Sequence, residues 1–123
     1  MKAAFTMIEL IFVIVILGIL AAVGVPKLAI ARNDARASVV ATQLSNCIQL
    51  SGKGYLMDNA FDVNDSNCVD VVTVQSCFIL VPDDENGTLN VKDVVNATNE
   101  CKAGQEIALK NNLSSSTGVI HQF

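Results

Sequence analysis

Four cysteines are the residues whose number and spacing constrain the chemistry most: Cys47, Cys68, Cys77 and Cys101. All lie beyond a long apolar stretch, and an even count in a small domain placed there indicates disulfides formed in an oxidising compartment. A zinc site is one alternative, but no pair has CxxC spacing and the chain has a single histidine, His121. Free thiols in a reducing cytosol are the other alternative. Four cysteines allow three pairings. We prefer Cys47 with Cys68, which would tie a helix to the start of a sheet, and Cys77 with Cys101.

A second group of residues could bind a cation through oxygen atoms. One segment begins like a calcium loop, with oxygen-bearing side chains at its first, third and fifth positions: Asp62, Asn64 and Ser66. It has Asn67 where the loop needs glycine and Thr73 where it needs glutamate. Residues 83–86 form another acidic cluster. We interpret both segments as polar turns and expect no metal or cofactor, with calcium as the alternative.

No set of residues points to catalysis. His121 has no nucleophile or carboxylate at a motif spacing, and the chain has no glycine-rich phosphate loop. From Met57 onward there are ten acidic residues and three basic ones, which argues against nucleic-acid binding by this distal part. We therefore expect a protein that is not an enzyme.

An apolar stretch over residues 5–25 precedes the residues discussed above and would hold the rest of the chain at one end of a long helix. As a helix it would cover about 30 Å, roughly the hydrocarbon thickness of a bilayer. Its one charged residue is Glu9. Gly18 and Gly24 lower helix propensity, and Pro26 removes a backbone donor, so we expect the segment 18–26 to be the weakest part of this helix.

Beyond Lys27 the pattern becomes that of an amphipathic helix, with Gly52 and Gly54 as signals for its end. Apolar residues recur there at steps of three and four: Ala37, Val40, Ala41, Leu44, Cys47 and Ile48. This face should pack against a globular domain.

The remainder reads as a small antiparallel sheet. After a polar loop over residues 55–67, the composition predicts a turn at 82–87 and a short helix near 105–110. Four strands are expected, at residues 69–74, 77–81, 88–95 and 118–123. The fold class is therefore α+β, a long N-terminal helix packed against a small antiparallel sheet.

The sequence AAFTMIEL at residues 3–10, followed by the apolar stretch and Pro26, closely resembles the prepilin motif of type IV pilins and type II secretion pseudopilins. The resemblance is specific over about the first 30 residues and architectural beyond them. It implies a leader peptide over residues 1–4, a transmembrane and filament-core helix over 5–26, an amphipathic helix over 27–54 and a globular β domain over 55–123.

The resemblance also implies a set of reactions and partners. A prepilin peptidase would cut between Ala4 and Phe5, and the new amino terminus of Phe5 would be N-methylated. Glu9 would pair with the amino terminus of a neighbouring copy during assembly. Most family members have glycine before the cut, and this chain departs from that pattern with Ala4, which is still a small residue.

The implied life cycle is that of a major pilin or major pseudopilin. The precursor would sit among lipids in the bacterial inner membrane as a single-pass protein with its distal domain in the periplasm. An inner-membrane assembly platform would polymerise identical copies into a helical filament, an extracellular pilus or a periplasmic pseudopilus.

Two observations leave alternatives open. Thr6 and Glu9 also have the spacing of a capping box, in which each satisfies a free N–H group at a helix start. Lys27, Arg32 and Arg36 outnumber Lys2, which by itself would place the distal domain in the cytoplasm; the cysteines and the resemblance place it outside. The alternative function is a signal-anchored, monomeric binding domain outside the membrane.

Overall fold

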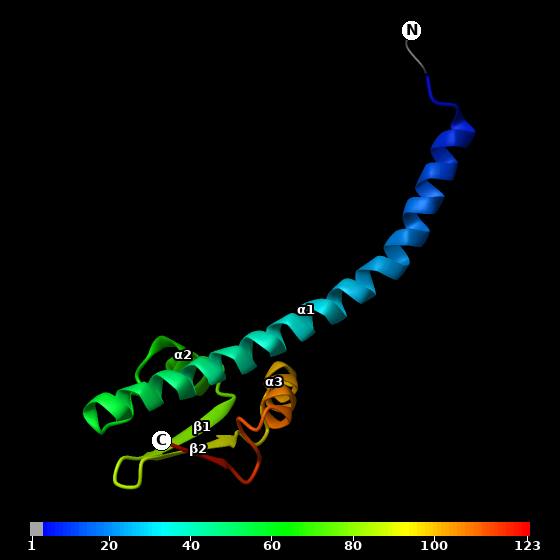
Figure 1. The fold of residues 1–123 in the computed structure, drawn as a ribbon. Helices are drawn as coiled ribbons and strands as arrows, with labels where there is room; N and C mark the ends of the chain where they lie inside the picture. Colours follow the sequence, from blue (N-terminus) through cyan, green and yellow to red (C-terminus); the bar gives the residue numbers. More distant parts are fainter. Residues whose placement is uncertain (1–3) are drawn as a thin grey trace. The chain divides into compact units, whose positions relative to one another are not determined.

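The computed structural model describes residues 4–123, so all of the expected leader except Ala4 lies outside the described residues. The chain divides into two compact units, Met1–Asn33 and Asp34–Phe123. Its elements follow the order α1, α2, η1, β1, β2, α3 and β3 (Figure 1). The expected α+β class, with a long N-terminal helix and a small antiparallel sheet, is confirmed.

Helix α1, Met7–Asp58, begins in the first unit. It passes through Gly18, Gly24 and Pro26 without interruption. Pro26 has no N–H group, so the carbonyl of Ala22 lacks its usual helical donor, and neither glycine supplies a side chain. The segment 18–26 that was expected to be weak is therefore helical in this structure. It contains the positions at which bending or unwinding the helix costs the least free energy.

The part of α1 in the second unit has the buried face that the sequence predicts. All six residues of the predicted stripe are buried: Ala37, Val40, Ala41, Leu44, Cys47 and Ile48. The expected end at Gly52 or Gly54 is wrong, because α1 continues to Asp58. It ends where Asn59 turns into the left-handed region with φ of 55° and donates its N–H to the Tyr55 carbonyl. A Cβ on Gly52 would overlap the ring of Phe123, so this glycine serves close packing instead of ending the helix.

The strand expected at residues 69–74 is also wrong. This segment forms α2, Ser66–Val69, and the π-helical turn η1, Asp70–Val74. Asp65 caps α2 by accepting from the Asn67 N–H, and the Thr73 hydroxyl donates to the Val69 carbonyl. These local bonds and the burial of Val71 outweigh the strand preference of a β-branched run.

Three strands form the sheet in the order β1–β2–β3, with antiparallel neighbours. They are β1, Phe78–Asp83, β2, Thr88–Asp93, and β3, Val119–Gln122. The expected strands at 77–81, 88–95 and 118–123 are confirmed in position. The turn that joins the first two occupies residues 84–87, because residues 82 and 83 of the expected turn belong to β1. Helix α3, Asn99–Lys110, is longer than the expected helix at 105–110.

The core of the second unit lies between α1, α3 and one face of the sheet (Figure 1). Val40, Leu44 and Ile48 of α1 meet Phe78, Leu89 and Val91 of the sheet, and Ala108 of α3 joins them. An aromatic group closes one end of this core, because Phe61 stacks on Tyr55 with ring centroids 4.7 Å apart and meets Phe123 edge-on at 5.6 Å.

Candidate functional site

The first turn of α1 holds Glu9 in a complete capping box. The Thr6 backbone N–H donates to Glu9 Oε2 at 2.8 Å, and the Thr6 hydroxyl donates to the same oxygen at 3.1 Å. In return the Glu9 N–H donates to Thr6 Oγ1 at 3.2 Å. Two N–H groups that a helix start leaves unpaired are thereby satisfied.

The capping box occupies one oxygen of the Glu9 carboxylate. Both hydrogen bonds from Thr6 to this carboxylate end on Oε2, and the side chain is exposed. An ionised carboxylate has about four lone-pair positions, so Glu9 can bind Thr6 and still accept from a second donor.

Around Glu9 the surface is almost entirely apolar. Phe5 is 87% exposed and Ile8 is 79% exposed, and all other side chains up to Asn33 are also exposed. The most apolar 18-residue window of α1 has a mean hydropathy of 2.9, so its length and composition suffice to cross a membrane. An apolar surface of this size marks a site of contact with lipid or protein.

The cysteines form two disulfides, Cys47–Cys68 and Cys77–Cys101, which are the pairs preferred from the sequence. The first joins α1 to α2, and the second joins the residue before β1 to α3. All four side chains are buried. The disulfides therefore connect the helices to the rest of the second unit.

The segments that resemble a calcium loop use their carboxylates within the fold. Asp62 Oδ1 accepts from the Asn64 N–H, and Asp84 Oδ1 accepts from the Phe61 N–H at 2.9 Å. Asp83 accepts from the backbone of the β1–β2 turn. Within residues 4–123, no three His, Cys, Asp or Glu side chains gather as ligands for a metal ion.

Hydrogen bonds lower the pKa of two partly exposed carboxyls in these segments, those of Asp65 and Asp83. The pKa of Asp65 is lowered mainly by the backbone N–H of Asn67 and then by its side-chain amide. The pKa of Asp83 is lowered mainly by the side-chain amide of Asn86, at 2.7 Å, and then by its backbone N–H. Both carboxylates act as caps of local turns.

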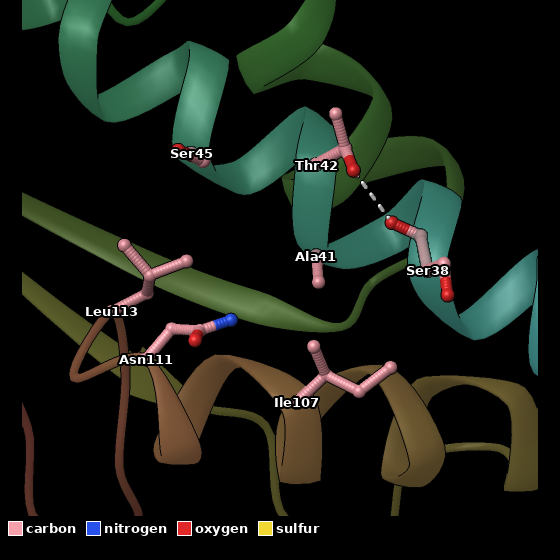
Figure 2. A pocket seen from close by; sticks show the side chains of 7 residues that line it. All are labelled: Ser38, Ala41, Thr42, Ser45, Ile107, Asn111 and Leu113. Atoms are coloured by element: carbon pink, nitrogen blue, oxygen red, sulfur yellow. Dashed lines mark hydrogen bonds between the residues drawn. The ribbon is translucent and has the colours of Figure 1, made fainter.

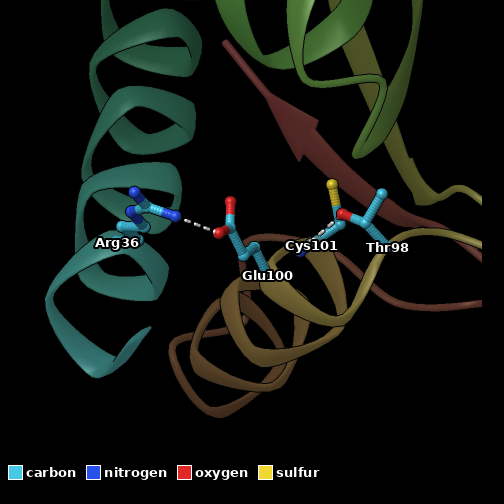
Figure 3. Close-up of polar contacts among 4 residues, drawn as sticks. All are labelled: Arg36, Thr98, Glu100 and Cys101. Atoms are coloured by element: carbon cyan, nitrogen blue, oxygen red, sulfur yellow. Dashed lines mark hydrogen bonds and ion pairs between the residues drawn. The ribbon is translucent and has the colours of Figure 1, made fainter. Parts of the chain in front are cut away.

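An ion pair joins α1 to α3 at the surface of the second unit. Arg36 donates to Glu100 Oε1, and both side chains are about half exposed (Figure 3). Next to it, Thr98 caps α3 by accepting from the Cys101 N–H at 3.3 Å (Figure 3). Exposed pairs of this kind are worth only about 0–1 kcal/mol, so this pair adds little to the stability of the second unit.

A shallow groove of about 340 Å³ also lies between α1 and α3 (Figure 2). Its walls carry small side chains from α1 and larger ones from α3 and the segment after it: Ser38, Ala41, Thr42, Ser45, Ile107, Asn111 and Leu113. The hydroxyls of Ser38 and Thr42 bond to backbone carbonyls of their own helix. This groove was not predicted from the sequence, although the four small residues of α1 have helical spacing.

His121 lies on β3, where its Nε2 is 2.9 Å from the Leu113 carbonyl oxygen. This contact ties β3 to the segment after α3 and brings no nucleophile to the imidazole. The structure thus groups the predicted residues into an apolar helix with Glu9 at its start and a disulfide-linked unit.

No family model, no curated protein and no solved structure matches this chain.

Proposed function

We propose that this protein is the subunit of a helical filament and polymerises through the apolar part of α1. One observation carries the proposal: the apolar stretch of α1 is wholly exposed, is long enough to span a bilayer and has its single carboxylate, Glu9, in the first turn of the helix. An anchor helix does not need that charge, which costs a few kcal/mol within a bilayer. A polymerising helix can use it to select a register between copies.

The partner that we propose for Glu9 is the amino terminus of a neighbouring copy. Cleavage between Ala4 and Phe5, followed by N-methylation of Phe5, would place a positive charge one turn before the carboxylate. The capping box would survive this cleavage, because the Thr6 N–H group belongs to the bond after Phe5. A contact between different groups on identical copies is heterologous, and such contacts generate an open helical filament when the rotation between copies does not close into a ring.

The proposal also implies a cellular location for the protein and the proteins that process and assemble it. A prepilin peptidase would process the precursor in the bacterial inner membrane, and an assembly platform there would add copies to a type IV pilus or a type II secretion pseudopilus. The second unit would lie in the periplasm before assembly. Its two disulfides support an oxidising compartment.

The capping box favours a second candidate function. Glu9 already has a partner within its own chain, Thr6, so a monomeric binding domain held by a signal anchor also accounts for the carboxylate. The mature amino terminus separates the two functions. Mass spectrometry should find an N-methylated Phe5 in a filament subunit, whereas an intact Met1 favours the monomeric anchor.

Two substitutions at one position test the filament proposal. Glutamine can replace glutamate in a capping box, so Glu9→Gln retains the cap and removes the charge, while Glu9→Ala removes both. We expect both variants to remain in the membrane and neither to appear among filaments sheared from cells and probed by immunoblot. Normal filaments from Glu9→Gln would reject the ionic role of Glu9.

A further inference from the structure

The middle of α1 carries an isolated group of charges. Lys27, Arg32, Asp34 and Arg36 are all exposed, and Asp34 is the one acidic residue of α1 between Glu9 and Asp58. Opposite charges on a helix stabilise each other when three or four residues apart. Asp34 has apolar or hydroxyl residues at all four of those positions: Ile30, Ala31, Ala37 and Ser38.

The cations of this group also have few oppositely charged neighbours within the chain. Arg32 stands four residues before Arg36, a spacing at which like charges repel. Arg36 is paired with Glu100, and this is the one ion pair among residues 4–123. Lys27, Arg32 and Asp34 therefore have no oppositely charged partner in the described part of the chain.

We infer that Asp34 of one copy binds Lys27 and Arg32 of the neighbouring copy in the filament, an inference that rests on the proposed function. If Glu9 of one copy meets the Phe5 amino group of the next, parallel helices are shifted by four residues, about 6 Å. Identical copies keep this shift along their whole length. Residue 34 of the first copy is then level with residue 30 of the second, between Lys27 and Arg32.

Charge complementarity selects a second copy over a lipid surface as the partner. Anionic headgroups attract lysine and arginine, but they repel a carboxylate placed among them. A neighbouring copy supplies both cations to the Asp34 carboxylate of the first copy. The Asp34 of that neighbouring copy in turn binds the cations of the copy after it. Each copy thus uses the cations and the anion once.

Zero-length crosslinking tests the contact directly. A carbodiimide joins a carboxylate to an amine only where the two touch, with loss of one water, and it can therefore link Asp34 to Lys27. Filaments are grown from cells expressing the full chain in ¹⁵N-labelled and unlabelled forms. We expect crosslinked peptides of mixed isotope content containing Asp34 and Lys27 in filaments, and none in membrane-extracted precursor. Filaments without the mixed crosslink, or with isotopically uniform pairs alone, would overturn the inference.

Charge reversal gives an independent readout. Asp34→Lys should lower the ratio of filament to precursor by about fivefold, the effect expected for one exposed pair, and adding Lys27→Asp and Arg32→Asp should restore it. Asp58→Lys, an exposed reversal at the end of the same helix, is the matched control and should assemble normally. If Asp34→Lys assembles normally while Glu9→Gln does not, the inference fails and the filament proposal stands. If Glu9→Gln also assembles, the ionic role of Glu9 and this inference fail together, whereas an absence of filaments from the wild type would reject the filament proposal itself.

Discussion

The Glu9 carboxylate accepts hydrogen bonds from both the backbone N–H and the hydroxyl of Thr6, and the Thr6 hydroxyl accepts one from the Glu9 N–H. This reciprocal arrangement fixes the start of α1 and holds the one carboxylate of the apolar stretch at its end. The two residues therefore give the helix a defined first turn, whichever molecule covers the apolar surface behind it.

Replacing Thr6 should loosen that first turn. Thr6→Ala removes the hydroxyl and, by the usual cost of losing an N-cap, destabilises the helix start by about 1 kcal/mol. Amide hydrogen exchange of the full chain in detergent micelles should become roughly fivefold faster at Glu9. Thr6→Ser is the matched control and should exchange like the wild type. Equal exchange rates in the two variants would contradict a role of the hydroxyl.

The disulfide between Cys47 and Cys68 should supply a large part of the stability of the second unit. It closes a loop with a sequence separation of 21 residues, for which chain entropy predicts about 3 kcal/mol. Tyr55 is the one tyrosine of a chain without tryptophan, so its fluorescence reports unfolding in guanidinium.

We expect Cys47→Ala/Cys68→Ala to unfold at a clearly lower guanidinium concentration than the wild type. Reductant should then shift the wild type further than this variant, which retains only the Cys77–Cys101 bond. An unchanged midpoint in the variant would show that burial alone holds α2 against α1.

Gly104 should be intolerant of any side chain. A Cβ at this position would lie 2.7 Å from Cγ1 of Val40 and 3.4 Å from the Ala37 carbonyl oxygen, so α3 would have to move away from α1. Overpacking of this kind costs about 1–3 kcal/mol, and we expect Gly104→Ala to lower the free energy of unfolding by that amount.

A paired substitution checks that the cause is steric. Val40→Ala removes Cγ1, the atom nearest to the added Cβ, but keeps the Val40 Cβ at 2.9 Å, so it relieves part of the clash. The double variant should therefore lose less stability than the sum of the two single losses in a double-mutant cycle. Additive losses would mean that the two sites act independently.

The β1–β2 turn should lose stability in acid. The pKa of Asp83 is lowered from its ordinary value of 3.8 by hydrogen bonds from Asn86, so it is lower in the folded state than in the unfolded state. The contribution of the carboxylate is therefore present above the unfolded pKa and lost as the pH falls through the folded pKa.

Comparison with Asp83→Asn reveals this contribution. The wild type should be the more stable protein at pH 7, and the difference in unfolding free energy should shrink as the pH falls below about 4. Glu106→Gln, at an exposed position of α3, is the control. A difference that persists unchanged in acid would assign the effect of Asp83→Asn to shape and not to charge.

The elements with strong periodicity could be predicted from sequence. The apolar stripe from Ala37 to Ile48 predicts which face of α1 is buried. Apolar runs separated by turn residues predict β1 and β2. The capping box could be anticipated as well, because both of its residues lie within one turn and depend on no distant partner.

The predictions that were wrong concern segments whose conformation depends on residues far away in the sequence. Gly52 looks like the end of a helix, yet it is the place where the Phe123 ring approaches α1. Residues 69–74 have strand composition, yet Val71 is buried in the core and the Cys47–Cys68 disulfide ties the preceding residues to α1. Local composition holds no information about either neighbour.

The sequence by itself determined the apolar helix, its solitary Glu9, the α+β class and the presence of cysteines suited to disulfides. The tertiary structure alone decided which turns end α1, that residues 69–74 are helical and that Arg36 is paired with Glu100. The physical reason is the range of the interactions. Periodicity and caps act within a few residues, whereas close packing, ion pairs and disulfides depend on groups that only the folded chain brings together.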